Sequence, residues 1–269
     1  MTKKDNLQVQ FWGVRGGIAC PGNETVRYGG NTACFQITCG DHRLIFDAGT
    51  GIRPLGDDLI KRSPVSADIF FSRTSFERIC GIPFFAAGYD PANSFRFWGD
   101  HQIEDEGVRD ALSKLMSAPI FPVSMDMMGA SLEFTDFKNG ETLSPSDGIT
   151  VTTAALNNSI MVTGYRVDWN GKIISYVSDL IHGENGDEAA ALTLLEGADM
   201  AIINTARNAG QGATWRDGID LCEAAGVATC VLYHHNPDRN DDHMDAVAAD
   251  AETFRPGTIV AVEGMVLTP

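Results

Sequence analysis

The sequence has little positive charge: 20 lysine and arginine residues stand against 36 aspartate and glutamate residues, for a formal net charge of −16. Binding to nucleic acid through its phosphates needs a basic surface, so we expect no general nucleic-acid partner. Long apolar runs are also missing. No segment approaches the ~18 apolar residues of a membrane span, and the first residues hold no apolar run typical of a signal peptide. We therefore expect a cytoplasmic protein with no membrane partner.

Two further absences concern cysteine and glycine motifs. None of the six cysteines forms a CxxC pair, and the 269-residue chain is long rather than small and disulfide-dense, so we expect reduced thiols. No GxGxxG follows a predicted strand and no GxxxxGK[ST] occurs. A doubly wound nucleotide-binding fold would need such a fingerprint and a more regular alternation of strands and helices.

The apolar pattern predicts two strand-rich halves, each finishing with helices. Strands are expected at 7–13, 32–39, 42–49, 68–72, 94–99, 131–137, 148–156, 161–169, 172–179, 198–204 and 227–235, with two short strands at the end of the chain. Helices are expected at 52–62, 106–116, 187–196, 214–226 and 241–253. No repeat or linker divides the chain. We therefore predict one domain over residues 1–269, with two sheets face to face and helices outside.

Six segments occur in the following order along the chain: FWGVRGG, PGNETVRYGGNTACFQI, LIFDAGTGIRPLG, FFSRTSFERICGIPFF, GYRVDWNGKIISYVSDLIHG and VLYHHNPDRNDD. Together they resemble the metallo-β-lactamase-fold hydrolases, in the branch of ribonuclease Z-like and cyclic-nucleotide phosphodiesterase-like members. The resemblance implies an α/β (α+β) fold, a four-layer αββα sandwich. It also implies hydrolysis by two metal ions, usually zinc, held by an HxHxDH loop, two later histidines and a bridging aspartate.

Most metal-ligand positions of that family are substituted here. The four ligand positions of the metal loop fall on Arg73, Ser75, Glu77 and Arg78, so at best one carboxylate remains. The next histidine of the family falls on Asn158. The resemblance therefore implies a degenerate metal loop.

A few ligand positions are kept. The resemblance assigns the bridging aspartate to Asp179 and two of the later histidines to His234 and His182. Asp47, in the segment DAGTG, matches a position that orients loops near the site. The chain has six histidines, and none lies between residues 43 and 100, where the metal loop falls. A family-type dinuclear site needs about five imidazole ligands, and with no histidine in the metal loop we do not expect these six to build one.

Two of the substituted positions carry arginine, whose charge suggests a role in place of the metal ions. Arginine is permanently cationic and cannot ligate a metal, so Arg73 and Arg78 would repel a divalent cation. They could instead pair with Asp179 and Glu77, which would otherwise be costly unpaired carboxylates in a dry pocket. We therefore expect arginine charge to replace metal charge in this loop.

Three functions remain open. In the first, the chain has lost the dinuclear-metal hydrolase site and is a pseudoenzyme without a cofactor, which binds an anionic small molecule or a protein partner. In the second, it is a phosphodiesterase-like hydrolase with a reduced metal site around Asp179 and His234, holding zinc or another divalent metal at low occupancy. In the third, it is a scaffold that assembles with active relatives. The family branch also favours a homodimer.

Overall fold

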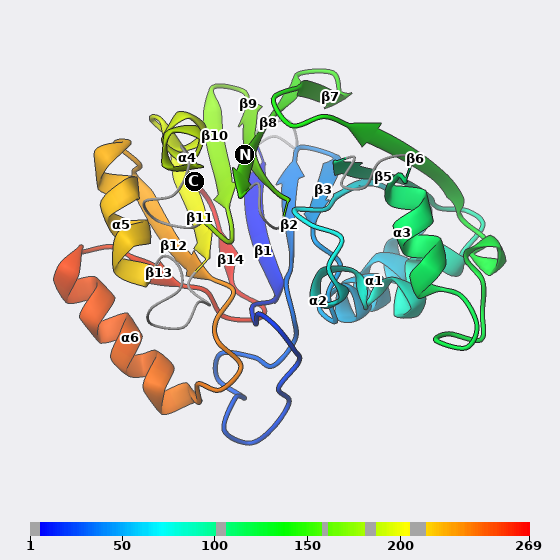
Figure 1. Ribbon diagram of the computed structural model, residues 1–269, viewed down its shortest axis with the longest axis horizontal. Coiled ribbons are helices and arrows are strands. Elements are labelled where there is room, and N and C mark those ends of the chain that lie inside the picture. The colour runs from blue at the N-terminus through cyan, green and yellow to red at the C-terminus, as the bar shows by residue number, and fades with distance from the viewer. Residues whose placement is uncertain (1–5, 101–105, 158–160, 181–186, 205–213) are drawn as a thin grey trace.

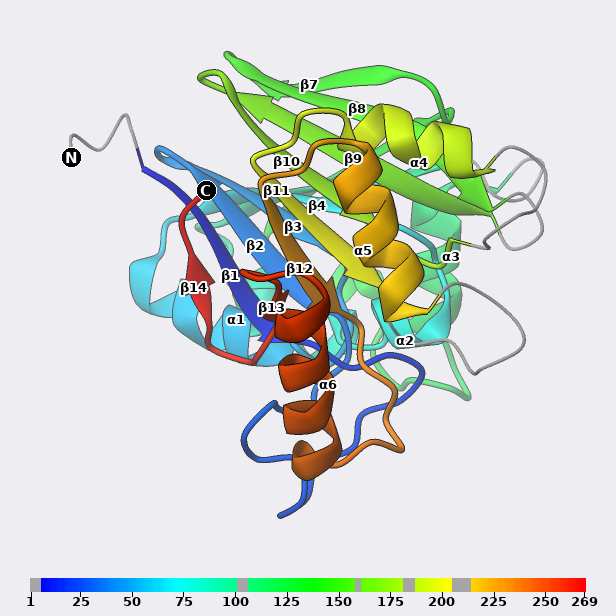
Figure 2. The same cartoon turned by 90° about the vertical axis from the view of Figure 1, so that its left-hand side faces the viewer.

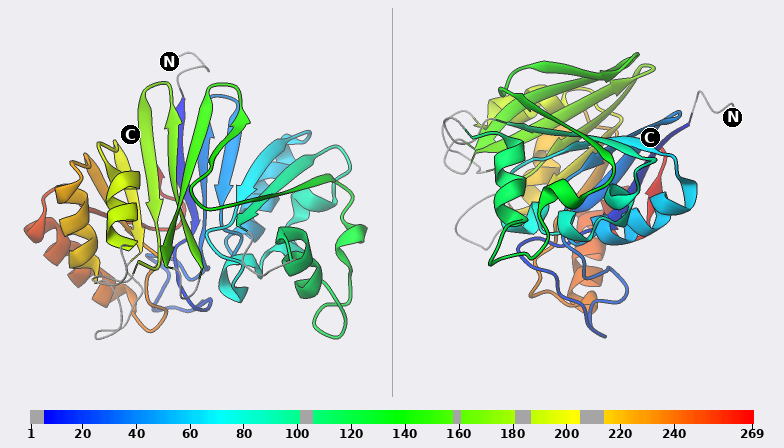
Figure 3. Two further views of the ribbon diagram at one scale, coloured as in Figure 1. Left: turned by 45° about the horizontal axis from the view of Figure 1, so that its top comes forward. Right: turned by 90° about the vertical axis from the view of Figure 1, so that its right-hand side faces the viewer.

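Two seven-stranded sheets lie face to face in the part of the chain that the structure describes, with helices on both outer faces (Figure 1). This computed structural model describes residues 6–100, 106–157, 161–180, 187–204 and 214–269. The arrangement confirms the predicted four-layer sandwich. The left view of Figure 3 shows helices on both sides of the paired sheets.

The first sheet has the strand order β14-β1-β2-β3-β4-β5-β6. Its strands β3 to β6 run parallel, while β14, β1, β2 and β3 are joined as antiparallel pairs. The strands are β1 (Leu7–Gly13), β2 (Cys34–Cys39), β3 (His42–Phe46), β4 (Ser66–Phe70), β5 (Ser94–Asp100), β6 (Ser131–Phe137) and β14 (Val266–Leu267).

The second sheet has the order β13-β12-β11-β10-β9-β8-β7. Here β10 to β13 run parallel, and β7 to β10 are joined as antiparallel pairs. The strands are β7 (Thr142–Ser146), β8 (Ile149–Asn157), β9 (Val162–Trp169), β10 (Lys172–Val177), β11 (Met200–Asn204), β12 (Thr229–Tyr233) and β13 (Ile259–Val260).

Helices cover the outer face of each sheet. The first sheet carries α1 (Ile52–Leu59), α2 (Phe76–Ile79) and α3 (Val108–Leu115), and the second carries α4 (Asp187–Leu195), α5 (Trp215–Ala224) and α6 (Asp241–Phe254), which Figure 2 brings to the front. The short 3-10 turns are η2 (Ile60–Arg62), η3 (Ile82–Phe84), η4 (Ala86–Tyr89) and η5 (Met125–Met127). No helix among the described residues is long and apolar enough to cross a bilayer.

The core between the sheets is rich in aromatic residues. Alternate residues of β1 are buried, as expected for a strand with one face in the core. Phe46, Phe70 and Trp98 come from neighbouring strands and stack with ring centroids 5.3 and 5.5 Å apart. Such pairs add stability beyond the burial of their area. The parallel strands of both sheets end near this core, and their ends carry the polar residues described next.

Candidate functional site

Polar residues follow the last residues of parallel strands in both sheets and meet at one edge of the sandwich. Asp47 follows β3, Asp179 lies just beyond β10 and His234 follows β12. All three adopt a left-handed backbone conformation, with φ of 58°, 52° and 62°. Residues other than glycine adopt it at a cost, and such strain persists where the surrounding structure holds it in place. The three side chains all contact Arg78, which lies in the segment that follows β4.

Arg78 lies at the centre of this cluster and is fully buried. Its Nη1 atom donates hydrogen bonds to Asp47 Oδ2 (2.6 Å) and to Ser72 Oγ (2.8 Å). The same atom donates to the Tyr176 hydroxyl (2.5 Å), which in turn donates to Asp47 Oδ2 (2.7 Å). Nη2 donates to Asp179 Oδ2 at 2.7 Å. One guanidinium therefore joins an aspartate of the first sheet to one of the second.

A second layer of contacts holds this arrangement. Asn204 Nδ2 donates to Asp179 Oδ1 (2.8 Å), and Asn204 Oδ1 lies 3.1 Å from His234 Nδ1. His234 Nε2 lies 3.2 Å from Arg78 Nη2. The His234 ring therefore lies between Asn204 and Arg78, with one ring nitrogen facing each of them.

Glu77 lies at the rim, with its carboxylate oxygens 3.5 Å from His234 Nε2 and 3.7 Å from Arg78 Nε. It also accepts a hydrogen bond from the backbone N–H of Gly17. Burial would raise the pKa of Glu77, but the contacts with His234, Arg78 and the Gly17 amide outweigh it and bring the pKa well below its usual range. Glu77 is therefore a carboxylate at neutral pH.

Electrostatics keeps Arg78 charged. Burial would lower the pKa of its guanidinium, but Tyr176, Asp47 and Asp179 outweigh that effect and raise the pKa well above the ordinary value. A buried charge is tolerated where it is paired and hydrogen-bonded. Here a single cation neutralises part of the negative charge of three carboxylates, those of Asp47, Asp179 and Glu77.

These residues do not fit a metal ion. Arg78 stands between Asp47 and Asp179, within hydrogen-bond distance of both. A divalent cation binding there would have to displace the guanidinium and overcome its repulsion. Across residues 6–100, 106–157, 161–180, 187–204 and 214–269, no group of three or more histidine, cysteine, aspartate or glutamate residues is arranged to hold a metal.

The other predicted site residues lie apart from this cluster or outside the described residues. Arg73 is half-buried and makes no hydrogen bond or ion pair with any described residue, so its expected pairing with Asp179 or Glu77 is not seen. Ser75 Oγ is buried and likewise has no partner in the described part of the chain. Asn158 and His182 fall in segments outside the described residues.

The sequence patterns missed several partners of Arg78. Asp47 was expected to orient loops, and it does accept hydrogen bonds from the Ser72 backbone N–H and hydroxyl (2.9 Å each). Its direct ion pair with Arg78 was not foreseen, nor were the contacts of Tyr176 and Asn204. The polar ends of the segments KIISY and MAIIN were the available signal, but the partners of Tyr176 come from the other sheet and those of Asn204 from the ends of the two flanking strands.

A mostly apolar pocket of about 260 Å³ adjoins the cluster and shares Glu77 with it. Its lining is Gly17, Ile18, Ala19, Asn31, Thr32, Thr50, Arg53, Phe76, Glu77, Cys80, Gly81 and Phe84. Phe76 and Phe84 are 67% and 57% exposed, so the pocket has an apolar surface open to solvent. Arg53 is exposed and makes no ion pair with a described residue.

No protein-family model and no curated protein sequence matches the chain. Solved structures do match. A metallo-beta-lactamase fold protein, YhfI from Bacillus subtilis, is 17% identical with a TM-score of 0.71, covering 98% of this chain and 99% of its own. The short form of human tRNase Z is 15% identical (TM-score 0.67; 97% and 98% covered), and Zn²⁺-bound PqqB from Methylobacterium extorquens is 16% identical (TM-score 0.67; 97% and 100% covered). The chain therefore has the metallo-β-lactamase fold.

Proposed function

We propose that this protein is a non-catalytic member of its fold, which binds a ligand beside a former metal site that an arginine now fills. The observation that carries the proposal is the pairing of Arg78 with Asp47 and Asp179 at 2.6 and 2.7 Å. Metal-assisted hydrolysis needs an open position where a metal activates water. A guanidinium supplies positive charge, but it cannot lower the pKa of a bound water as a coordinating metal does.

The ligand that we propose is a small organic anion with an apolar body. Arg78 is an unsuitable partner for it, since the guanidinium is fully buried and already paired with Asp47 and Asp179. The adjoining pocket supports binding better. Its lining is largely apolar, and Arg53 offers an exposed cation without an ion-pair partner among the described residues. The apolar body would fill the pocket and the anionic group would face Arg53.

A matched pair of small molecules tests which class of ligand binds. Hexanoate and 1-hexanol share an apolar chain and differ in charge, and isothermal titration gives the affinity of each. We expect hexanoate to bind more tightly, and Arg53→Gln to weaken hexanoate by about threefold with little effect on hexanol, as for an exposed ion pair. Equal binding of both probes, or no binding of either, would contradict the proposed ligand. If the unaltered protein self-associates and the Phe76→Ser variant does not, this surface would instead bind a protein partner, such as a second copy of the chain in a homodimer.

The alternative function is a phosphodiesterase-like hydrolase with a reduced metal site around Asp179 and His234. Both side chains contact Arg78 or its neighbours, and both are nearly buried. An assay of bis(p-nitrophenyl) phosphate hydrolysis with added zinc or manganese separates the two functions. We expect no zinc-dependent rate above that of an Asp179→Asn variant. A rate that rises with metal and falls in this variant would support the hydrolase.

A further inference from the structure

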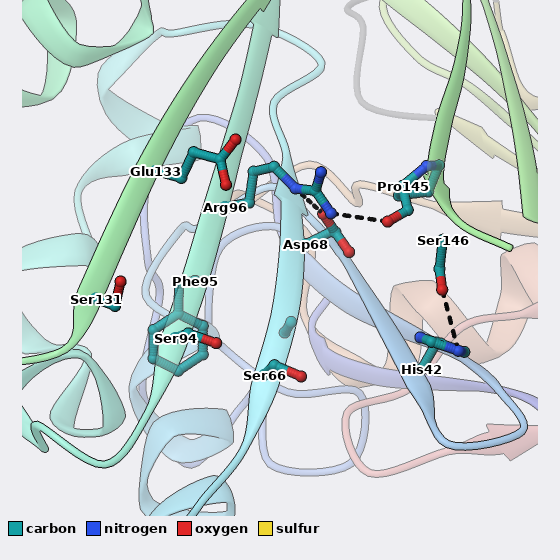
Figure 4. Close-up of a pocket in the computed structure, with 11 residues that line it drawn as sticks. His42, Ser66, Asp68, Ser94, Phe95, Arg96, Ser131, Glu133, Pro145 and Ser146 are labelled. Carbon is teal, nitrogen blue, oxygen red and sulfur yellow. Dashed lines mark hydrogen bonds and ion pairs between the residues drawn. The ribbon is translucent and has the colours of Figure 1, made fainter.

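A second cavity lies at the opposite end of the sandwich from the arginine cluster. It has a volume of about 290 Å³ and opens between strands β4, β5 and β6 of the first sheet and β7 of the second (Figure 4). Ser66, Ser94 and Ser131, the first residues of β4, β5 and β6, line it. The arginine cluster instead follows the last residues of parallel strands, so the two sites are separate.

Strand register arranges the lining as a polar grid, which we call the polar cradle. Each strand contributes residues two apart, so their side chains share the face of the sheet that turns toward the core. The pairing gives two rows, Ser66-Ser94-Ser131 and Asp68-Arg96-Glu133. The next residues along β4 and β5 on this face, Phe70 and Trp98, belong to the aromatic core. The polar cradle therefore begins where the packing between the sheets ends.

Arg96 and Asp68 form an ion pair inside the polar cradle. Arg96 Nε donates to Asp68 Oδ1 (2.8 Å), and Nη2 donates to the carbonyl of Pro145 on β7 (2.7 Å). The guanidinium also lies over the Trp98 ring, 4.8 Å from its centroid, and the indole N–H donates to Asp68 Oδ1 (2.8 Å). These contacts hold Arg96 in place and neutralise it, so it offers little attraction to an anion.

His42 and Ser146 also line the cavity and pair with each other, with Ser146 Oγ 3.1 Å from His42 Nε2, and the other polar side chains of the lining can meet a ligand. Glu133 is exposed, and its carboxylate makes no hydrogen bond or ion pair with a described residue. The hydroxyl groups of Ser66, Ser94 and Ser131 make no hydrogen bond within the described part of the chain either. Figure 4 shows Glu133 beside Arg96, with the serines along the neighbouring strands. The cavity thus presents one unpaired carboxylate and three hydroxyl groups.

We propose that the polar cradle binds a small hydroxylated amine of about the size of an amino sugar. An ammonium group would pair with Glu133, and hydroxyl groups would exchange hydrogen bonds with Ser94 and its neighbours. The volume of about 290 Å³ lies at the lower end of the range for ligand pockets, so it suits a single ring rather than an extended chain. An anion would be repelled by Glu133, and among the described residues of the lining the one guanidinium, that of Arg96, is already paired.

Glucosamine and glucose are suitable probes, since they share a ring and differ in one amino group. In isothermal titration at neutral pH and low salt, we expect glucosamine to bind with a millimolar dissociation constant and glucose to bind at least about tenfold more weakly. Glu133→Gln should remove that difference. Glu196→Gln, a matched change of an exposed glutamate at the end of α4, should leave both affinities unchanged.

A blocking variant checks the location. Ser94→Phe fills the middle of the cradle, and far-ultraviolet circular dichroism establishes that it is folded. We expect it to lose glucosamine binding while hexanoate still binds the pocket near Arg53. The proposal is overturned if glucosamine does not bind the unaltered protein, if glucose binds as tightly, or if a folded Ser94→Phe variant binds glucosamine normally.

Discussion

Removal of the Arg78 side chain should destabilise the protein more than most single substitutions do. Arg78→Leu keeps an apolar stem but leaves Asp47 and Asp179, whose side chains are 1% and 9% exposed, without their counter-ion. Breaking a buried ion pair by removing one partner costs about 3–5 kcal/mol, because an uncompensated buried charge is left behind. We therefore expect the free energy of unfolding to fall by about that amount.

Urea unfolding followed by circular dichroism measures this loss. The matched control is Arg73→Leu in the same loop, since Arg73 is half-buried and pairs with no described residue. We expect the control to lie within about 0.5 kcal/mol of the unaltered protein. The slope of the free energy with urea concentration should stay the same in both variants, so that the midpoints report stability alone.

A double-mutant cycle isolates the ion pair from other effects of the substitution. Asp179→Asn removes the opposite charge, and Arg78→Leu combined with Asp179→Asn should cost less than the sum of the two single changes, by about 0.5–3 kcal/mol. The reasoning would be refuted by additive effects, or by an Arg78→Leu variant that loses less than about 1 kcal/mol, the value of an exposed pair.

Three further outcomes are expected. Tyr176→Phe removes a hydroxyl that contacts Arg78 and Asp47 and should cost about 1–3 kcal/mol in urea unfolding. Arg78→His removes the guanidinium and adds an imidazole beside Asp47 and Asp179, so zinc should raise the Tm of this variant and leave that of the unaltered protein unchanged in thermal melts. Burial lowers the pKa of His235 from 6.5 to about 3. The unfolded state therefore binds its proton first, and stability that is complete above pH 6.5 should fall by about 2 kcal/mol between pH 7 and about pH 5. Urea titrations at the two pH values should show a smaller loss of stability in His235→Gln than in the unaltered protein. An equal loss in both proteins would contradict the prediction.

The periodicity of apolar residues predicted most of the strands and helices, and the elements that it missed have local explanations. The segment LQVQFWG alternates and forms β1, and the capping box at Thr214 begins α5 as expected. The pattern missed α2, because four residues are too few to display a helical repeat. It also missed β7, which contains Pro145 and lies at the edge of its sheet, where a strand tolerates proline.

The candidate site was harder to foresee than the fold. Charge alone led us to expect arginine to pair with Asp179, and the structure has Arg78 doing so. Charge could not tell Arg78 from Arg73, because the two differ in which way the loop turns after β4. Asp47 contacts Arg78 from the end of a neighbouring strand of the same sheet, and Tyr176 contacts it from the other sheet, 31 and 98 residues away along the chain. Such contacts follow from tertiary packing, which single-sequence patterns do not encode.

The metal content of the purified protein tests most directly whether Arg78 takes the place of the metal ions. The protein would be produced in zinc-supplemented medium, dialysed without chelator and measured by inductively coupled plasma mass spectrometry against protein concentration. The paired guanidinium predicts a zinc content far below one ion per chain, with Arg78→His binding more zinc than the unaltered protein. About two zinc ions per chain in the unaltered protein, as a dinuclear site requires, would contradict the account.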